Sequence, residues 1–235
     1  MLASLHFIDD GFRGTSRARA LTRIARAAPQ LRHLEYLYSG WGGHVDPAHP
    51  HPVPRTTAHA LMRRDSFGSM VHPTRRGLFC VWEGEADARR FAQRVGDEGG
   101  CGQEGWNLIL RPISSRGRLH GHDPLAVSDR EKYQPTGPVL IATNGSVRWS
   151  RLPRLQRENV GPLSEVTSAQ GLQKGLSGFT LGRSIQVFTW TRWDDLSSGL
   201  RFAYQSAAHP SRIAGERGDR PIFDDTWFAR FEIIE

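Results

Sequence analysis

The sequence predicts an α+β protein built from two fused ferredoxin-like halves, each with the order β-α-β-β-α-β. The first observation is an order shared by two stretches: an apolar strand ending in Trp, a helix with an acidic start, an Arg-Phe-Ala triplet, and a strand opening near Trp. The triplets are Arg90–Ala92 and Arg201–Ala203. The second observation is that each stretch follows an earlier strand and helix. Two such sheets, packed face to face, would bury both apolar faces and leave a cavity between sheet and helices.

Periodicity predicts the elements of the first half. Residues 3–8 form an apolar strand, and a helix follows at 16–28. The apolar run 77–82 is a further strand, and 105–111 alternates into another. A helix is predicted over residues 83–96, and its apolar residues lie mainly on one side: Ala86, Ala88, Phe91, Ala92 and Val95.

The second half repeats this pattern. Its strands are predicted at 138–143, 185–190 and 225–234, and its helices at 150–160 and 193–207. Pro153 must lie in the first turn of its helix, because an interior proline would break the hydrogen-bond ladder. Asp194 or Asp195 could cap the other helix, whose first backbone amides need an acceptor.

This pattern predicts three parts of the chain. Residues 1–116 form the N-terminal ferredoxin-like half, and 138–235 form the C-terminal half with the cofactor site. Residues 117–137 are polar, contain two prolines and are read as the linker. The Gly-rich stretch 171–182 lacks the strand-to-helix context of a phosphate-binding loop, so we assign it no nucleotide role.

Composition and charge argue against several classes of protein. No apolar run approaches the roughly 18 residues of a membrane span, and the N-terminus lacks the pattern of a secretory signal. Cys80 and Cys101 do not make a disulfide framework, so we expect a reduced, cytoplasmic protein. The net charge of +7 comes mostly from scattered arginines, so we expect a small-molecule substrate and no nucleic-acid partner. Exposed sheet edges could still pair two chains into a homodimer.

One histidine lies in a part of the second half that the first half lacks. The interval between the two matched tryptophans is about 24 residues in the first half and about 37 in the second. The extra residues include His209 and Pro210, and the proline fixes the local backbone geometry. His209 is therefore a candidate cofactor ligand. The alternative is an ordinary histidine, which is favourable near any helix C-terminus.

A loop over residues 41–59 carries four more histidines: His44, His49, His51 and His59. Such a loop can bind a metal. However, no two of them lie at i, i+4 on a helix and no Cys joins them, which gives little support to a structural zinc site. We interpret this segment as a surface loop.

Several short segments together carry a family resemblance. They are Pro54–Ala58, Trp82 with the helix after it, Ser115–Arg118 leading to Asp123–Leu125, Ser146–Leu152, and Ala208–Pro210 through Trp227–Phe231. In order and spacing they resemble the spheroidene monooxygenase family of carotenoid ketolase-type proteins, over most of the chain. The resemblance implies a dimeric α/β-barrel-type fold within one chain, with haem b as the cofactor.

The resemblance also implies site residues. Ala208-His209-Pro210 resembles the region that carries the axial histidine of aldoxime dehydratases, so His209 is the expected iron ligand. The haem propionates would need counter-charges such as Arg148, Arg183 and Arg212. Residues that could line the cavity, or simply pack the core, are Phe188, Phe202, Phe223, Trp190 and Trp227. Asp224 and Asp225 could orient a ligand or accept a proton, or lie in a solvated turn.

One segment departs from the family. Its members tend to have a Gly-x-Gly-Glu turn before the strand that ends in Trp190, whereas Gly175–Gly178 has no acid. Because of this departure, the resemblance does not establish a carotenoid as the substrate.

The leading hypothesis is a haem-dependent, monooxygenase-like oxidoreductase acting on a largely apolar secondary metabolite. One alternative is a haem-dependent lyase of the aldoxime dehydratase type. The others are a cofactor-free monooxygenase and a small-molecule binding module on the same fold.

Overall fold

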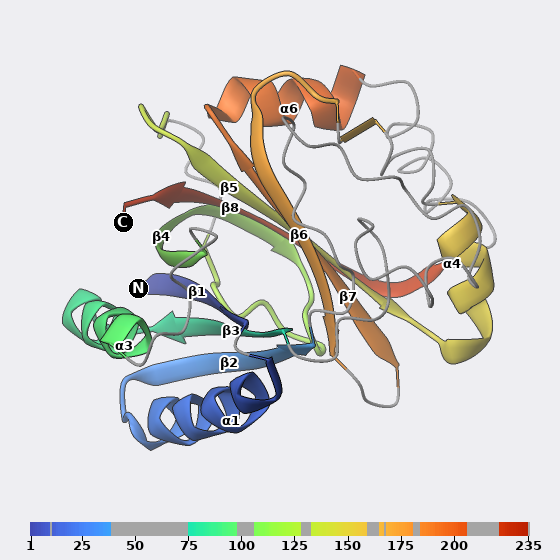
Figure 1. Cartoon of the computed structure of the whole chain (residues 1–235). Coiled ribbons are helices and arrows are strands. Elements are labelled where there is room, and N and C mark those ends of the chain that lie inside the picture. Colours follow the sequence, from blue (N-terminus) through green and yellow to red (C-terminus); the bar gives the residue numbers. More distant parts are fainter. Residues whose placement is uncertain are drawn as a thin grey trace.

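The computed structural model describes residues 1–9, 11–38, 75–97, 106–127, 133–158, 165–166, 168–180, 184–205 and 221–234. Within these ranges eight strands close into one barrel, with helices on its outside (Figure 1). The strand order around the barrel is β1-β3-β2-β6-β7-β5-β8-β4. Neighbouring strands are antiparallel throughout.

The described elements fall into two sets with the same order. The first set is β1 (Leu2–Asp9), α1 (Gly11–Ala27), β2 (Leu31–Tyr38), β3 (Arg75–Trp82), α3 (Glu85–Asp97) and β4 (Asn107–Gly117). The second set is β5 (Val139–Val147), the 3₁₀ turn η1 (Trp149–Arg151) with α4 (Leu152–Glu158), β6 (Leu172–Thr180), β7 (Ile185–Trp193), α6 (Leu196–Gln205) and β8 (Phe223–Ile233). Both sets read β-α-β-β-α-β.

The sheet topology confirms the predicted fold class. Within the barrel the first set runs β4-β1-β3-β2 and the second runs β8-β5-β7-β6, so equivalent strands occupy equivalent places. The fourth strands of the two sets pair along most of their length, from Leu110↔Ile233 to Gly117↔Trp227. The second strands meet at the single pair Tyr38↔Phe179. Two fused ferredoxin-like halves therefore share one closed sheet. The domain boundaries proposed from the sequence stay predictions.

The barrel interior is an apolar core with contributions from all eight strands. Phe79 lies near its centre, with its ring 5.0 Å from that of Trp190 and 6.2 Å from that of Phe231. Burial of side chains of this size contributes about 1.5–3 kcal/mol each. Leu119 and Leu125, between β4 and β5, are fully buried in the same cluster. That segment therefore packs into the barrel and does not merely bridge the halves.

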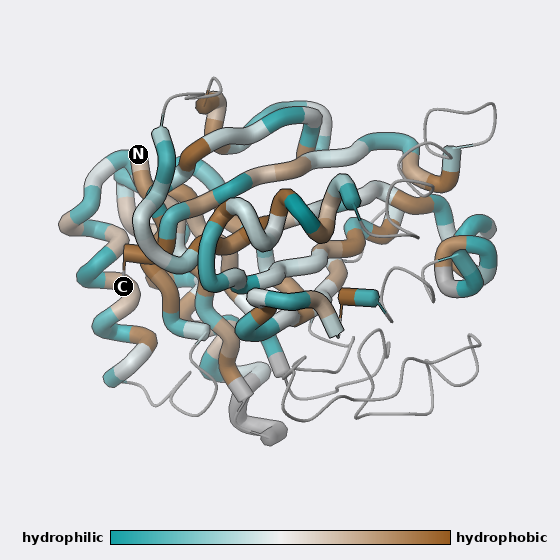
Figure 2. Tube along the Cα trace, turned by 90° about the horizontal axis from the view of Figure 1, so that it is seen from above, coloured by the Kyte–Doolittle hydropathy of each residue, from teal (hydrophilic) through white to brown (hydrophobic). Residues whose placement is uncertain are grey.

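The outer face of the sheet is covered differently in the two halves. On the first half, α1 and α3 bury a continuous cluster that includes Leu21, Phe91 and Trp82. On the second half, α6 packs over Val139 and the short α4 packs over another part of the face. Figure 1 shows α6 and α4 at separate places on the second half, and Figure 2 shows hydrophobic and hydrophilic residues alternating along the strands. No helix in the described ranges combines the length and apolar character needed to cross a membrane.

Several predicted boundaries were wrong. Helix α1 begins at Gly11, five residues before the predicted start. Strand β7 continues past Trp190 to Trp193, so α6 begins only at Leu196. Trp193, and not Trp190, therefore ends the strand in the way that Trp82 ends β3.

Two strands were not located from the sequence. These are β2, and β6 at Leu172–Thr180. The stretch Gly175–Gly178, read as a turn in the family comparison, lies inside β6. By contrast, Pro153 does lie in the first turn of α4, as predicted.

Candidate functional site

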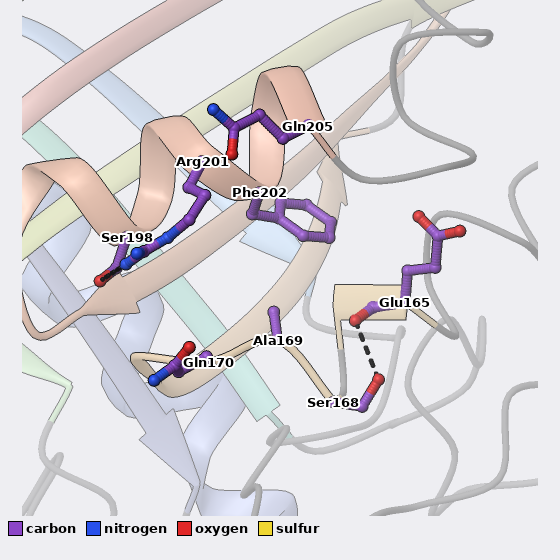
Figure 3. A pocket seen from close by; sticks show the side chains of 8 residues that line it. All are labelled: Glu165, Ser168, Ala169, Gln170, Ser198, Arg201, Phe202 and Gln205. Atoms are coloured by element: carbon purple, nitrogen blue, oxygen red, sulfur yellow. Dashed lines mark hydrogen bonds between the residues drawn. The ribbon is translucent and has the colours of Figure 1, made fainter.

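A pocket of about 400 Å³ lies beside the C-terminal part of α6 (Figure 3). Helix α6 and the chain before β6 both line it, with Ser198, Arg201, Phe202 and Gln205 from the helix and Glu165, Ser168, Ala169 and Gln170 from the chain. Arg201 donates a hydrogen bond to Ser198 Oγ at 3.1 Å, and Ser168 Oγ donates to the Glu165 carbonyl oxygen at 3.2 Å. The lining thus combines one aromatic ring, one cation, one carboxylate and two side-chain amides.

Local interactions fix α6 above the sheet. The backbone amide of Ser198 donates a hydrogen bond to Asp195 Oδ1 at 2.7 Å, so Asp195 is the cap of this helix. The same hydrogen bond lowers the pKa of the Asp195 carboxyl. Gly199 lies so close to Ile141 that an added Cβ would clash with its Cδ1. The Phe202 ring stacks on Trp193, with centroids 5.5 Å apart. The contact between the first turns of α6 and the sheet is therefore filled, and open space lies toward Phe202 and Gln205.

Three of the predicted site residues, His209, Arg183 and Arg212, lie outside the described residues, so their roles stay predictions. Helix α6 ends at Gln205, four positions before His209.

The predicted propionate partner Arg148 forms an ion pair. Its Nε lies 3.0 Å from Oδ2 of Asp224, while a guanidinium nitrogen of Arg151 lies 2.9 Å from Oδ1 of the same carboxylate. Arg151 also donates to the carbonyl oxygens of Pro221 and Ile222, each at 3.3 Å. Asp224 therefore joins the η1 turn to the start of β8.

The predicted aromatic residues lie on two different faces of the sheet. Phe188 and Trp227 are fully buried in the barrel interior. Phe223 packs on the outer face, where an added Cβ on Gly145 would strike its ring. A bulge in β8 opposite Ser146 and Val147 accounts for the switch, because one extra residue reverses the alternation of side chains. The structure thus brings Phe188 and Trp227 together but separates them from Phe223.

A buried amide lies between the two interior aromatic residues. Asn144 of β5 is opposite Phe188 on one side and Trp227 on the other. Its Nδ2 donates to the Val187 carbonyl oxygen at 3.2 Å, and its Oδ1 has no hydrogen-bond partner among the described residues. A buried acceptor without a partner is costly. Sequence periodicity gave no signal for it.

Three residues from segments of the family resemblance meet at one carboxylate. Asp123 Oδ2 accepts a hydrogen bond from Ser115 Oγ at 2.5 Å, and Oδ1 accepts one from Trp227 Nε1 at 3.0 Å. The Leu125 amide also donates to Oδ1, at 3.1 Å. This carboxylate ties the segment between the halves to β4 and β8. The motif residues were visible in the sequence, but their contact was not predicted.

A second polar cluster, also missed from the sequence, surrounds Glu35 on β2. Oε1 of Glu35 lies 3.1 Å from Nε2 of His120 and 2.9 Å from Nε2 of His33. The His33 ring in turn packs edge-on against His122 at 5.4 Å. Desolvation would raise the pKa of the buried Glu35 carboxyl, but the two imidazoles outweigh it and the pKa is lowered. The hydrogen bond to Glu35 raises the pKa of His120. A carboxylate with two imidazoles is a chemically competent acid–base group.

Metal ligation finds no support in the described ranges. They contain no group of three or more His, Cys, Asp or Glu side chains placed to hold a metal ion. The loop that carries His44, His49, His51 and His59 lies outside them.

The fold and these sites define a single-chain α+β barrel with two ferredoxin-like halves. The sequence is similar to two spheroidene monooxygenases, from Rubrivivax gelatinosus (29% identical over 169 residues, 70% of this chain) and Rhodobacter capsulatus (25% over 134 residues, 54% of this chain). The alignments span 62% and 52% of those proteins' own length. The resemblance seen in the short segments is thus confirmed. No family model matches the sequence.

Three solved structures of distant sequence align with most of the chain, at low TM-scores. One is a proposed monooxygenase of Fusobacterium nucleatum, with a TM-score of 0.39 and 7% identity, and the match covers 100% of this chain and 92% of that one. Another is an anthrone oxidase-like protein, with a TM-score of 0.35 and 12% identity, and the match covers 100% of this chain and 91% of that one. The third is a haem-degrading enzyme of Listeria monocytogenes, with a TM-score of 0.33 and 9% identity, and the match covers 97% of this chain and 99% of that one. Because these scores are low, the fold assignment rests on the strand order and register.

Proposed function

We propose that this protein is a monooxygenase-type oxidoreductase that binds haem b in its second half, with His209 as the axial ligand. The similarity to two spheroidene monooxygenases supports the reaction class. One observation carries the proposed location: the pocket beside α6 lies at the helix end from which the chain runs on to His209. A largely apolar secondary metabolite as substrate, and a cytoplasmic location, are parts of the same proposal.

The pocket lining is mostly polar, but two of its side chains suit a flat group with acidic substituents. Phe202 offers a ring face, and Arg201 offers a guanidinium that can bind a carboxylate. None of the eight lining residues is His, Cys, Met or Tyr, the types that ligate haem iron. An iron ligand therefore has to come from outside this lining, and His209 would supply it.

The described residues would then act by binding and positioning. When bound, haem would supply the iron at which dioxygen or peroxide is activated. Arg201 would hold a propionate, and the Phe202 ring, fixed by its stack on Trp193, would keep water from one face of the group. Arg148 would be less available to a propionate, because its guanidinium is already paired with Asp224 and it does not line the pocket.

Haem titration of matched variants tests the proposal. We expect the wild-type chain to develop a Soret band that responds to dithionite and carbon monoxide, and His209→Ala to lose it. His122→Ala is the control, because His122 is an exposed histidine of the cluster around Glu35 and does not line the pocket. Arg201→Gln should weaken haem binding by about tenfold, the loss of one charge-assisted hydrogen bond. Full haem occupancy with an unchanged spectrum in His209→Ala would refute the assignment.

A cofactor-free monooxygenase is the second candidate, and the Glu35 cluster favours it. A buried carboxylate beside two imidazoles could move a proton without any metal. Turnover by a colourless protein that is abolished by Glu35→Gln would support this alternative. Turnover with haem but without an oxidant would instead indicate a lyase of the aldoxime dehydratase type. Ligand affinity without any turnover would indicate a binding module.

A further inference from the structure

A second pocket, also of about 400 Å³, lies between α1, β2 and the end of β6. Its lining consists of Arg19, Thr22, Arg23, Arg26, Tyr36, Tyr38 and Thr180. We call it the Arg-Tyr groove. Three guanidinium groups line one side and two phenol rings line another, so the groove is cationic and partly aromatic. The pocket beside α6 shares none of these residues.

Helix α1 is strongly cationic. Its 17 residues include five arginines and no Asp or Glu. Arg19, Arg23 and Arg26 follow at i, i+4 and i+7 on one face, where like charges repel. Among the described residues none of these three arginines forms an ion pair. A bound anion would remove this repulsion.

Three arginines on two other helices have acidic partners. On α3, Arg89 pairs with Glu85 and Arg90 with Asp87. On α4, Arg154 pairs with Glu158. Arg19, Arg23 and Arg26 have no such partner among the described residues, which distinguishes this row from the paired arginines of α3 and α4.

The floor of the groove is aromatic and partly buried. The rings of Tyr36 and Tyr38 pack edge to face at 5.3 Å, and the Arg76 guanidinium lies over the Tyr38 ring at 5.1 Å. Tyr38 also stacks on Phe179 at 5.8 Å. Burial raises the pKa of Tyr36, so its hydroxyl stays protonated at neutral pH. The floor thus offers ring faces beside a row of cations.

We propose that the Arg-Tyr groove binds a small organic molecule that carries a diphosphate. Guanidinium forks match phosphate oxygens in pairs. From Arg19 to Arg26 the helix rises about 10 Å, so two adjacent phosphate groups engage the row better than one. The tyrosine rings would pack against the organic part of the ligand. This site is independent of the proposed haem site.

The groove also lies at the weaker seam of the barrel. Arg19, Arg23 and Tyr38 belong to the first half and Thr180 to the second. Here β2 and β6 share one register pair, whereas β4 and β8, at the other seam between the halves, share seven. A ligand held from both sides therefore stabilises the closed barrel, because it binds the folded state and not the unfolded chain.

Calorimetric titration with inorganic pyrophosphate tests the proposal on the full-length chain. We expect one site, weaker binding of orthophosphate and succinate, and a raised melting temperature with pyrophosphate. Arg23→Gln/Arg26→Gln should weaken pyrophosphate binding by about 10- to 100-fold, the loss of two charge-assisted hydrogen bonds. Arg89→Gln/Arg90→Gln on α3 removes the same charge elsewhere and should change binding by less than about threefold.

Three results would overturn the proposal. One is no pyrophosphate binding at millimolar concentration. Another is equal weakening in the α1 and α3 variants, which would show that net charge alone attracts the anion. The third is succinate binding as tightly as pyrophosphate, which would remove the diphosphate assignment. Melting temperatures of the two variants without ligand show that each is folded, so lost binding is not mistaken for unfolding.

Discussion

Nε2 of His120 lies 3.1 Å from Oε1 of Glu35, and this contact joins the segment between the two halves to strand β2. Glu35 is buried and His120 is exposed. The contact occurs at a tight turn in which Leu119 and His122 form an isolated bridge and His120 has a φ of 53°. Few side chains adopt this left-handed backbone without strain. The ion pair helps to hold the turn against the barrel.

This ion pair predicts a stability contribution with two pH limits. The pKa of Glu35 is lowered from 4.5, so its share is present above that value and is lost as the pH falls through the folded pKa. The pKa of His120 is raised from 6.5, so its share is present below 6.5 and is lost as the pH rises through the folded pKa. The pair therefore contributes fully between pH 4.5 and 6.5.

His120→Gln should lower the free energy of unfolding by about 0.5–1 kcal/mol near pH 6, and by much less near pH 9. Urea unfolding at the two pH values measures the difference. His122→Gln, two residues along the same turn, is the control, because among the described residues Glu35 forms its ion pairs with His33 and His120. A loss in His120→Gln that is the same at both pH values would mean that packing, not charge, holds the contact.

A buried histidine on β1 predicts acid destabilisation. His6 is fully buried, its Nδ1 lies 2.5 Å from Asn107 Oδ1, and its Nε2 has no partner among the described residues. Burial lowers its pKa from 6.5 to about 4. Since the unfolded chain then binds more protons below pH 6.5, stability falls as the pH drops from 6.5 toward 4.

The lowered pKa of His6 corresponds to about 3 kcal/mol of stability lost over that range, at 1.36 kcal/mol per unit. His6→Gln removes the titration and keeps a donor for Asn107. We expect this variant to be less stable near neutral pH but to lose less stability on acidification. The measurement is the free energy of unfolding of both proteins as the pH falls from neutral to acidic values. If this free energy depends on pH in the variant as it does in the wild type, the assignment to His6 is contradicted.

The Asp123 carboxylate predicts strong coupling between two distant parts of the chain. Asp123→Ala leaves Trp227 Nε1 and the Leu125 amide without their acceptor, which should cost about 1–3 kcal/mol. Trp227→Phe removes one donor and also leaves a cavity in the barrel interior, and the cycle separates this packing loss from the hydrogen bond. Because the two residues share a hydrogen bond, we expect the double variant to be less destabilised than the sum of the single ones. Additive losses in a double-mutant cycle would show that the two residues act separately.

The repeat explains why the fold was predictable from the sequence. Trp82 and Phe91 are nine residues apart and pack at 5.2 Å, and Trp193 and Phe202 repeat both the spacing and the contact at 5.5 Å. In each pair the Trp lies at the end of a strand and the Phe lies on the helix that follows, so the spacing is a local property that the sequence displays. The sequence comparison matched Trp82 with Trp190, whereas the structural equivalent is Trp193, three residues later. The apolar pattern alone did not show where β7 ends.

The missed strands have physical explanations. In β2 the inward positions near its start hold His33 and Glu35, so the expected apolar alternation is absent. Strand β6 contains Gly175 and Gly178, and glycine is depleted in strands. The Glu35 cluster was equally hidden, since His120 lies far along the chain and no local spacing connects the two. The contact of Asp123 with Trp227 spans 104 positions, so the motifs marked the residues but not their meeting.

Two glycines with the same backbone angle predict how the barrel seam responds to a methyl group. Gly117 and Gly121 both have a φ of 86°, but a Cβ on Gly117 would clash with the carbonyl oxygen of Thr226, whereas a Cβ on Gly121 meets nothing within 4 Å. Gly121→Ala should therefore cost only the left-handed conformation, about 1–2 kcal/mol. Gly117→Ala must in addition shift β8 away from β4 at the stronger seam, so we expect a clearly larger loss of unfolding free energy. Chemical denaturation of the two variants compares them directly. Equal losses would mean that β8 moves freely and that the β4–β8 seam does not hold the two halves in register.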